Sequence, residues 1–130
     1  MRSAARRIPV TILHWPACSK SRACVDLFAQ RLPPTAFAVV DFGADPPPRP
    51  TMVDVFDMLS KEDHAAIIRD ATEEEKKQGD LALREIAIKH PERMQRPVIV
   101  NWNSGTAIIG RPIDRVASVV REIASALETT

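Results

Sequence analysis

Residues 8–22 read IPVTILHWPACSKSR, where an apolar stretch ends and a cysteine opens a polar one. The apolar residues 8–13 predict a strand, and residues 19–30, with apolar positions at helical spacing, predict a helix. Cys18 therefore lies where a strand turns into a helix, and there the free N–H groups of the first turn meet the helix dipole. Such a position lowers the pKa of a thiol from about 8.5 into the range of about 3.5–7.5. The sequence thus predicts a thiolate nucleophile, beside which the same amides can hold an oxyanion.

A second strand follows this helix. Residues 36–42 are apolar except for Asp41 and predict a fully buried strand, which we expect to pair in parallel with the first. A proline-rich extended connector, residues 45–50, comes next. Three patterns typical of capping boxes then predict helix starts: Thr51 before Asp54, Ser60 before Asp63, and Thr72 before Glu75.

The helices expected from these starts cover residues 52–59, 61–69 and 73–78, and a fourth covers 81–89 with Asp80 as its cap. The chain then returns to sheet, because residues 97–101 and 106–109 predict an antiparallel hairpin. Pro112 suits the first position of a last helix that ends near residue 127.

This order of elements, β-α-β, helices, β-β-α, is that of an α/β, thioredoxin-like domain with helices inserted before the closing hairpin. We expect a single domain over residues 1–130, because this length closes one hydrophobic core. Its core is expected at about residues 8–45 and 95–128, and the helical insertion at about residues 51–90.

Composition and charge indicate which classes of partner the protein is not expected to bind. The chain is 45% hydrophobic, and 18 basic residues nearly balance 17 acidic ones to give a net charge of +1. No strong field would attract nucleic acid or a membrane surface, and no apolar stretch approaches the ~18 residues of a membrane span. We therefore expect neither nucleic acid nor a membrane as a partner.

The amino terminus and the cysteines bear on the compartment. Arg2, Arg6 and Arg7 precede the first strand without an apolar core, so we expect no secretory signal. Two cysteines six residues apart make no disulfide framework. A reducing cytoplasm is the expected location.

The second cysteine, Cys24, is expected to pack in the hydrophobic core. Six residues of helix rise by about 9 Å, whereas a disulfide needs Cα atoms within roughly 7 Å. Cys24 also shares its helical phase with Leu27 and Phe28, which favours packing over redox chemistry. The reductant of Cys18 must then come from outside the chain.

Several polar residues are candidates for the same site. Ser21 can donate its hydroxyl to the sulfur. Arg22, one helical turn after Cys18, adds positive charge that can bind a substrate. His14 can stabilise the thiolate or shuttle a proton. His14 is alternatively a strand-end residue bonded to a carbonyl. No usual zinc-ligand spacing is present, so we expect no metal.

Three later arginines stand at the edges of elements: Arg69, Arg96 and Arg111. A tetrahedral oxyanion needs several donors in a planar fork, which guanidinium supplies and ammonium does not. Two of the three precede a proline, which fixes the local backbone.

The motifs HWPACSKSR, RPVIV and IGRP resemble the glutaredoxin-coupled arsenate reductase family over about residues 10–122. The resemblance implies that Cys18 attacks arsenate, that His14 keeps Cys18 ionised and that Ser21 bonds its sulfur. It implies that Arg69, Arg96 and Arg111 bind the oxyanion, and that Pro97 is the cis-proline of a thioredoxin-like fold. No bound cofactor is implied, because glutathione acts as co-substrate and glutaredoxin recycles the mixed disulfide.

One position departs from the family pattern, because Trp15 stands where the family usually has Asn. Either the ring forms a wall of the pocket, or the substrate is not arsenate. Two other functions fit the fold: a glutathione-linked thiol-transfer module, and a redox-sensing binding protein similar to the Spx family. The latter usually carries Cys-x-x-Cys, and here Ser21 replaces the second cysteine.

Overall fold

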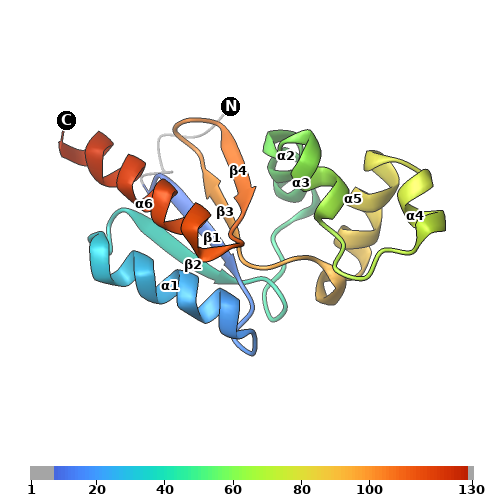
Figure 1. The fold of residues 1–130 in the computed structure, drawn as a ribbon, viewed down its shortest axis with the longest axis horizontal. Coiled ribbons are helices and arrows are strands. Elements are labelled where there is room, and N and C mark those ends of the chain that lie inside the picture. The colour runs from blue at the N-terminus through green and yellow to red at the C-terminus, as the bar shows by residue number, and fades with distance from the viewer. Residues whose placement is uncertain (1–7, 129–130) are drawn as a thin grey trace.

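Four strands form one mixed sheet flanked by helices in a computed structural model, which describes residues 8–128 (Figure 1). The strands are β1 (Val10–His14), β2 (Phe37–Asp41), β3 (Val98–Asn101) and β4 (Thr106–Ile109), in the order β2-β1-β3-β4. β1 pairs with β2 in parallel, whereas β1–β3 and β3–β4 are antiparallel. The predicted thioredoxin-like α/β arrangement is confirmed, including the parallel pair and the closing hairpin.

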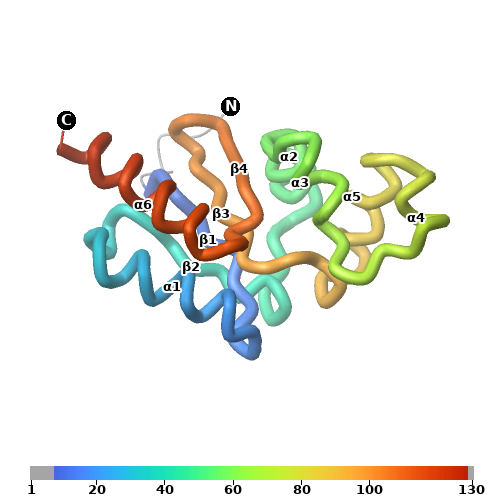
Figure 2. The backbone as a smooth tube through the Cα atoms, viewed as in Figure 1, coloured from blue at the N-terminus to red at the C-terminus, as the bar shows by residue number. Residues whose placement is uncertain are grey.

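Two long helices pack together beside the sheet, and shorter ones form a lobe on its other side (Figures 1 and 2). The long helices are α1 (Ser19–Arg31) and α6 (Ile113–Glu128). The lobe contains α2 (Arg49–Met58), α3 (Lys61–Ala66), α4 (Glu73–Lys77), α5 (Asp80–Lys89) and the 3-10 turn η1 (Pro91–Arg93). This lobe is the predicted helical insertion between β2 and β3.

The sheet separates two buried clusters, because strand side chains alternate between its faces. On the face of α1 and α6, strand residues Val10, Ile12 and Ile99 pack against Cys24 and Phe28. On the opposite face, Leu13, Val98 and Val100 pack against residues of α2 and α5, including Phe56 and Leu83. The insertion therefore completes the core of the sheet and does not stand free of it.

Some expected boundaries and burial patterns are wrong. β2 is not fully buried, since Val39 is 42% exposed; it is an edge strand with a single neighbour, and full burial requires cover on both faces. α2 begins at Arg49 rather than after Thr51, because Pro50 fits the first helical turn, where no N–H is needed. Residues 49 and 50 therefore belong to α2 and not to the connector.

Other helix ends also differ from the sequence expectation. Asp80 is the first residue of α5 and not its cap, because Gly79 occupies the cap position with a positive φ of 94° that favours glycine. α3 ends at residue 66, and α6 begins one residue after Pro112. The Thr72–Glu75 capping box is confirmed in both directions.

Asp63 ties the insertion to the sheet. Its carboxylate accepts the N–H of Ile109 in β4 at 3.1 Å and two hydrogen bonds from Arg115 in α6 at 3.0 and 3.1 Å. The second expected capping box is therefore only half formed: the Ser60 hydroxyl accepts from the Asp63 N–H, but the Asp63 side chain is used elsewhere. Because Asp63 is only 6% exposed, its carboxylate is shielded from water.

Replacing Asp63 with asparagine is expected to destabilise the fold by about 1–2 kcal/mol, because the amide keeps one acceptor but loses the charged hydrogen bonds to Arg115. Urea unfolding followed by circular dichroism measures this change. Glu85→Gln is a matched control, since it weakens the ion pairs of Glu85 with Arg49 and Arg84 at the surface, and pairs of this kind contribute little to stability. Equal stability of the two variants would contradict the assigned role of Asp63.

Within residues 8–128, no helix is long and apolar enough to cross a membrane. The expectation of no secretory signal concerns the arginine-containing start of the chain, which lies outside the described residues.

Candidate active site

Cys18 is the residue that caps the amino terminus of α1, in the short turn after β1. Its backbone N–H donates to the carbonyl of Trp15 at 2.9 Å, and its own carbonyl accepts the N–H of Arg22 at 3.0 Å, which starts the helix. Its side chain is partly exposed. The turn thus presents the sulfur where the first free amides of the helix point, as the sequence predicts.

Several groups act on the Cys18 thiol. Burial on its own raises its pKa, but hydrogen bonds from the backbone N–H groups of Ser21 and Lys20 act against burial. The charge of Arg111 and a hydrogen bond from Arg96 lower the pKa further, so that it lies below its usual value. The thiolate is therefore favoured at a pH where an ordinary cysteine is still protonated.

Alkylation of Cys18 by iodoacetamide is expected to rise with pH through a midpoint below the value of about 8.5 for a free cysteine. The sign follows from the lowered pKa: the reactive thiolate persists to lower pH than in an unperturbed thiol. Mass spectrometry of the modified peptide distinguishes Cys18 from Cys24. A midpoint at or above that of free cysteine would contradict the prediction.

Arg111 reaches the sulfur from the far end of the chain. Its Nη2 lies 3.2 Å from Cys18 Sγ, and its Nε donates to the carbonyl of Arg96 at 2.8 Å. The connection between β4 and α6 carries this side chain, so the fold of the closing hairpin delivers it to the start of α1. The peptide bonds Arg96–Pro97 and Arg111–Pro112 are both cis.

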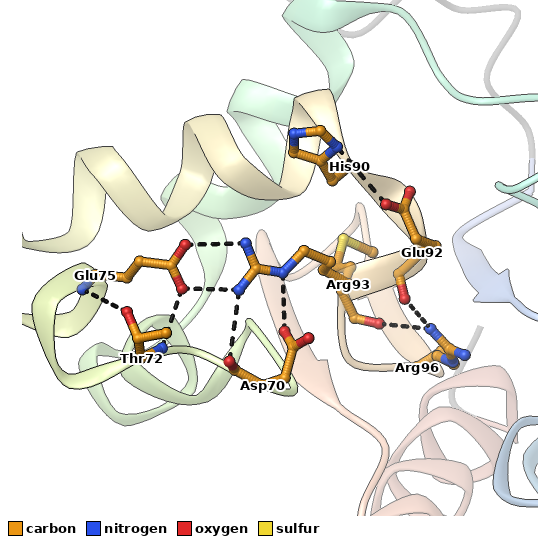
Figure 3. Close-up of polar contacts among 8 residues, drawn as sticks. Asp70, Thr72, Glu75, His90, Glu92, Arg93 and Arg96 are labelled. Atoms are coloured by element: carbon orange, nitrogen blue, oxygen red, sulfur yellow. Dashed lines mark hydrogen bonds and ion pairs between the residues drawn. The ribbon is translucent and has the colours of Figure 1, made fainter.

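Arg96 is the most buried of the site's arginines, at 7% exposed. Its Nη1 donates to the carbonyls of Glu92 and Met94 at 2.8 and 3.2 Å (Figure 3). Its guanidinium carbon lies 4.5 Å from the centre of the Trp15 ring. The two carbonyls and the face of the Trp15 ring therefore hold the charged guanidinium of Arg96 in place near Cys18.

The turn that supplies those carbonyls is held by Arg93, as Figure 3 shows. Arg93 Nε lies 2.9 Å from Asp70, and its two Nη atoms lie 2.9 and 2.7 Å from the Glu75 carboxylate. This fork links η1 to the start of α4. In the sequence, Glu75 is recognisable only as part of a capping box, and no local pattern marks Arg93 as its partner.

Arg69 joins the group at its outer side. Its backbone N–H donates to the Arg93 carbonyl at 2.8 Å, so the same turn positions it. Its side chain is exposed. Burial and, after it, the like charge of Arg69 lower the pKa of Arg96, whereas Cys18 raises it. Two of the three arginines named from the sequence thus act directly on Cys18, and Arg69 lies beside Arg96.

The polar residues of the Cys18 loop have other contacts than expected. The Ser21 hydroxyl lies 2.7 Å from His14 Nδ1 and accepts the Trp15 N–H at 3.0 Å, so it is engaged away from the sulfur, whereas the Ser21 backbone N–H helps to lower the pKa of Cys18. Ser21 is fully buried beneath the loop, which explains this orientation. Arg22 donates to the Pro16 carbonyl at 2.8 Å and so braces the loop from outside.

Within residues 8–128, no interaction joins His14 directly to Cys18, and Ser21 is the residue that connects them. Burial and, to a smaller extent, the charge of Arg22 lower the pKa of His14, while Asp41 and Asp26 raise it. The net pKa is lowered, so the ring is neutral near pH 7. A neutral ring fits a residue that positions the Ser21 hydroxyl and, through it, the loop.

Cys24 lies fully buried in the core with Phe28, and burial raises the pKa of its thiol to about 12. The prediction that Cys24 packs in the core is confirmed. Within residues 8–128, no three side chains of the metal-binding types gather closely enough to hold an ion.

Fold and site together define a thioredoxin-like protein with a partly exposed thiol at a helix start, flanked by guanidinium groups. An arsenate reductase of Neisseria meningitidis serogroup A is 31% identical over 119 residues, which cover 85% of this chain and 97% of the relative. The solved structure of an arsenate reductase from Vibrio cholerae is 26% identical, with a TM-score of 0.66 over 87% of this chain and 98% of that one. No family model matches the sequence. The chain belongs to the arsenate reductase family.

Proposed function

We propose that this protein reduces arsenate, with Cys18 as the nucleophile and with glutathione and glutaredoxin as the reductants. The observation that carries the proposal is the contact of 3.2 Å between Arg111 and Cys18 Sγ at the start of α1. A cation and free amides around one sulfur favour the thiolate and leave donors for an oxyanion. Membership of the arsenate reductase family supports this substrate.

In the proposed reaction the Cys18 thiolate attacks the arsenic of arsenate and forms an S–As bond, while one oxygen leaves as water after protonation. Arg96 and Arg111 balance the charge of the adduct, and Arg69 adds a third guanidinium at the outer side. Guanidinium groups offer paired N–H donors in one plane and therefore bind such an anion more tightly than single ammonium groups do.

Glutathione then completes the reduction. Its thiolate attacks the Cys18 sulfur, the S–As bond breaks, and the electron pair passes to arsenic, which leaves as arsenite. Cys18 is left as a mixed disulfide with glutathione, and a glutaredoxin thiol restores it. An external thiol is needed because Cys24 is buried and protonated. The proposal requires no bound cofactor, and it places the protein in a reducing compartment, the cytoplasm.

An assay that couples arsenate, glutathione and glutaredoxin to NADPH oxidation through glutathione reductase tests the proposal. Turnover that depends on arsenate and on both thiol components is expected. Turnover with a disulfide substrate but none with arsenate would instead indicate a glutathione-linked thiol-transfer protein, and the arsenate proposal would fail.

A further inference from the structure

Trp15 and Arg96 form a stacked pair beside the reactive sulfur. The guanidinium carbon of Arg96 lies 4.5 Å from the centre of the Trp15 ring, within the range of a cation–π interaction. Behind the ring, Phe42 packs with its centre 5.2 Å away at an interplanar angle of 55°. The ring is therefore held between the buried core and the cation.

Hydrogen bonds alone leave Arg96 incompletely held. Its Nη1 is bound by two carbonyls, but its Nε is buried and, within residues 8–128, has no hydrogen-bond partner. The like charges of Arg69 and Arg111 also act on it. A flat aromatic face stabilises a guanidinium that is repelled by its neighbours and shielded from water, because the attraction grows as the pair is desolvated.

Gly43 is the residue that makes room for this ring. A Cβ atom at Gly43 would lie 2.6 Å from Trp15 Cζ3 and 2.9 Å from Cη2, closer than any side-chain carbon tolerates. These atoms belong to a rigid ring packed against Phe42 and Arg96, so an added methyl group requires the ring to shift. A side chain at position 43 would therefore displace the ring from beneath Arg96.

We propose that Trp15 is a positioning residue whose ring holds the Arg96 guanidinium against the Cys18 sulfur, and that Gly43 admits the ring to that place. The inference rests on the proposed role of Cys18 as a nucleophile but not on the identity of the oxyanion. It explains how a large ring is compatible with the site: Trp15 supports the Arg96 guanidinium from behind.

Two variants of Trp15 separate the aromatic face from simple packing. Trp15→Leu keeps apolar bulk without a π face, and the midpoint of Cys18 alkylation is expected to move to higher pH because Arg96 is held less firmly. Trp15→Phe is expected to restore most of the wild-type midpoint, since a phenyl ring also attracts a cation. Trp102→Phe is the matched control, because it replaces a buried tryptophan whose Nε1 bonds Thr11, away from the sulfur.

Gly43→Ala provides an independent test that leaves Trp15 itself unchanged. It is expected to shift the midpoint in the same direction as Trp15→Leu, and to have no further effect when combined with it, because the two changes disrupt one contact. Near-UV circular dichroism and a thermal melt confirm that each variant is folded under the assay conditions. An unchanged midpoint in folded Trp15→Leu and Gly43→Ala would overturn the proposal.

Where arsenate turnover is observed, the KM for arsenate is expected to rise about 3- to 30-fold in Trp15→Leu, the range that corresponds to a partly or fully desolvated cation–π contact. The value of kcat should change less, because the reacting thiol is still present. If wild-type protein reduces no arsenate, the proposed function fails, whereas the alkylation midpoints still decide the role of Trp15.

Discussion

Replacing Cys18 with serine is expected to reduce arsenate-dependent turnover to the rate without enzyme. The hydroxyl of serine stays protonated under conditions in which the Cys18 thiol ionises, so the amides and arginines around it have no anion to stabilise. Cys24 cannot take over, because it is fully buried and its pKa is raised to about 12. The coupled assay with glutathione and glutaredoxin measures the loss.

The matched control is Cys24→Ala, which removes the other thiol from the core. It is expected to lower stability while leaving turnover in the folded protein, because Cys24 packs with Phe28 away from the site. When glutaredoxin is omitted, intact-mass analysis should find one glutathione on wild-type protein and on Cys24→Ala, but none on Cys18→Ser. Persistent turnover in Cys18→Ser, or its loss in folded Cys24→Ala, would refute the proposed nucleophile.

The sequence predicted the parts of this fold that depend on local pattern. Hydrophobic periodicity placed all four strands and both long helices, and the turn before α1 located Cys18 at a helix start. The burial of Cys24 followed from its helical phase. Helix starts were less certain, because several residues near a boundary can cap: Gly79 caps α5 although Asp80 follows it directly.

The long-range contacts in the site could not be predicted from local sequence patterns. Arg93 and Glu75 are 18 residues apart, and nothing in either segment marks them as a pair. The Ser21 hydroxyl turns toward His14 because it is buried beneath the loop, and burial on that scale depends on how the whole domain packs. Trp15 shows the same limit, since its role depends on Arg96 and Gly43, which come from distant segments.

Arg111→Lys is expected to weaken the site even though it conserves charge. The guanidinium bonds two groups at once, since Nη2 reaches the Cys18 sulfur and Nε reaches the Arg96 carbonyl. An ammonium group cannot reproduce this planar fork. Because a hydrogen bond to a charged group contributes about 1.5–3 kcal/mol, kcat/KM for arsenate should fall by about 10- to 100-fold, mostly through KM.

The same substitution should also raise the pKa of Cys18, because Arg111 is one of the groups that lower it and an ammonium group does not reproduce the contact of 3.2 Å between Nη2 and the sulfur. Alkylation would then reach its midpoint at higher pH, a result that is independent of any substrate. Arg121→Lys is the control, since it changes an exposed arginine of α6, the helix that follows Arg111 in the chain. If Arg111→Lys and Arg121→Lys matched each other in both KM and alkylation midpoint, the contact of Arg111 with the sulfur would have no functional role, and the oxyanion site would have to be sought without it.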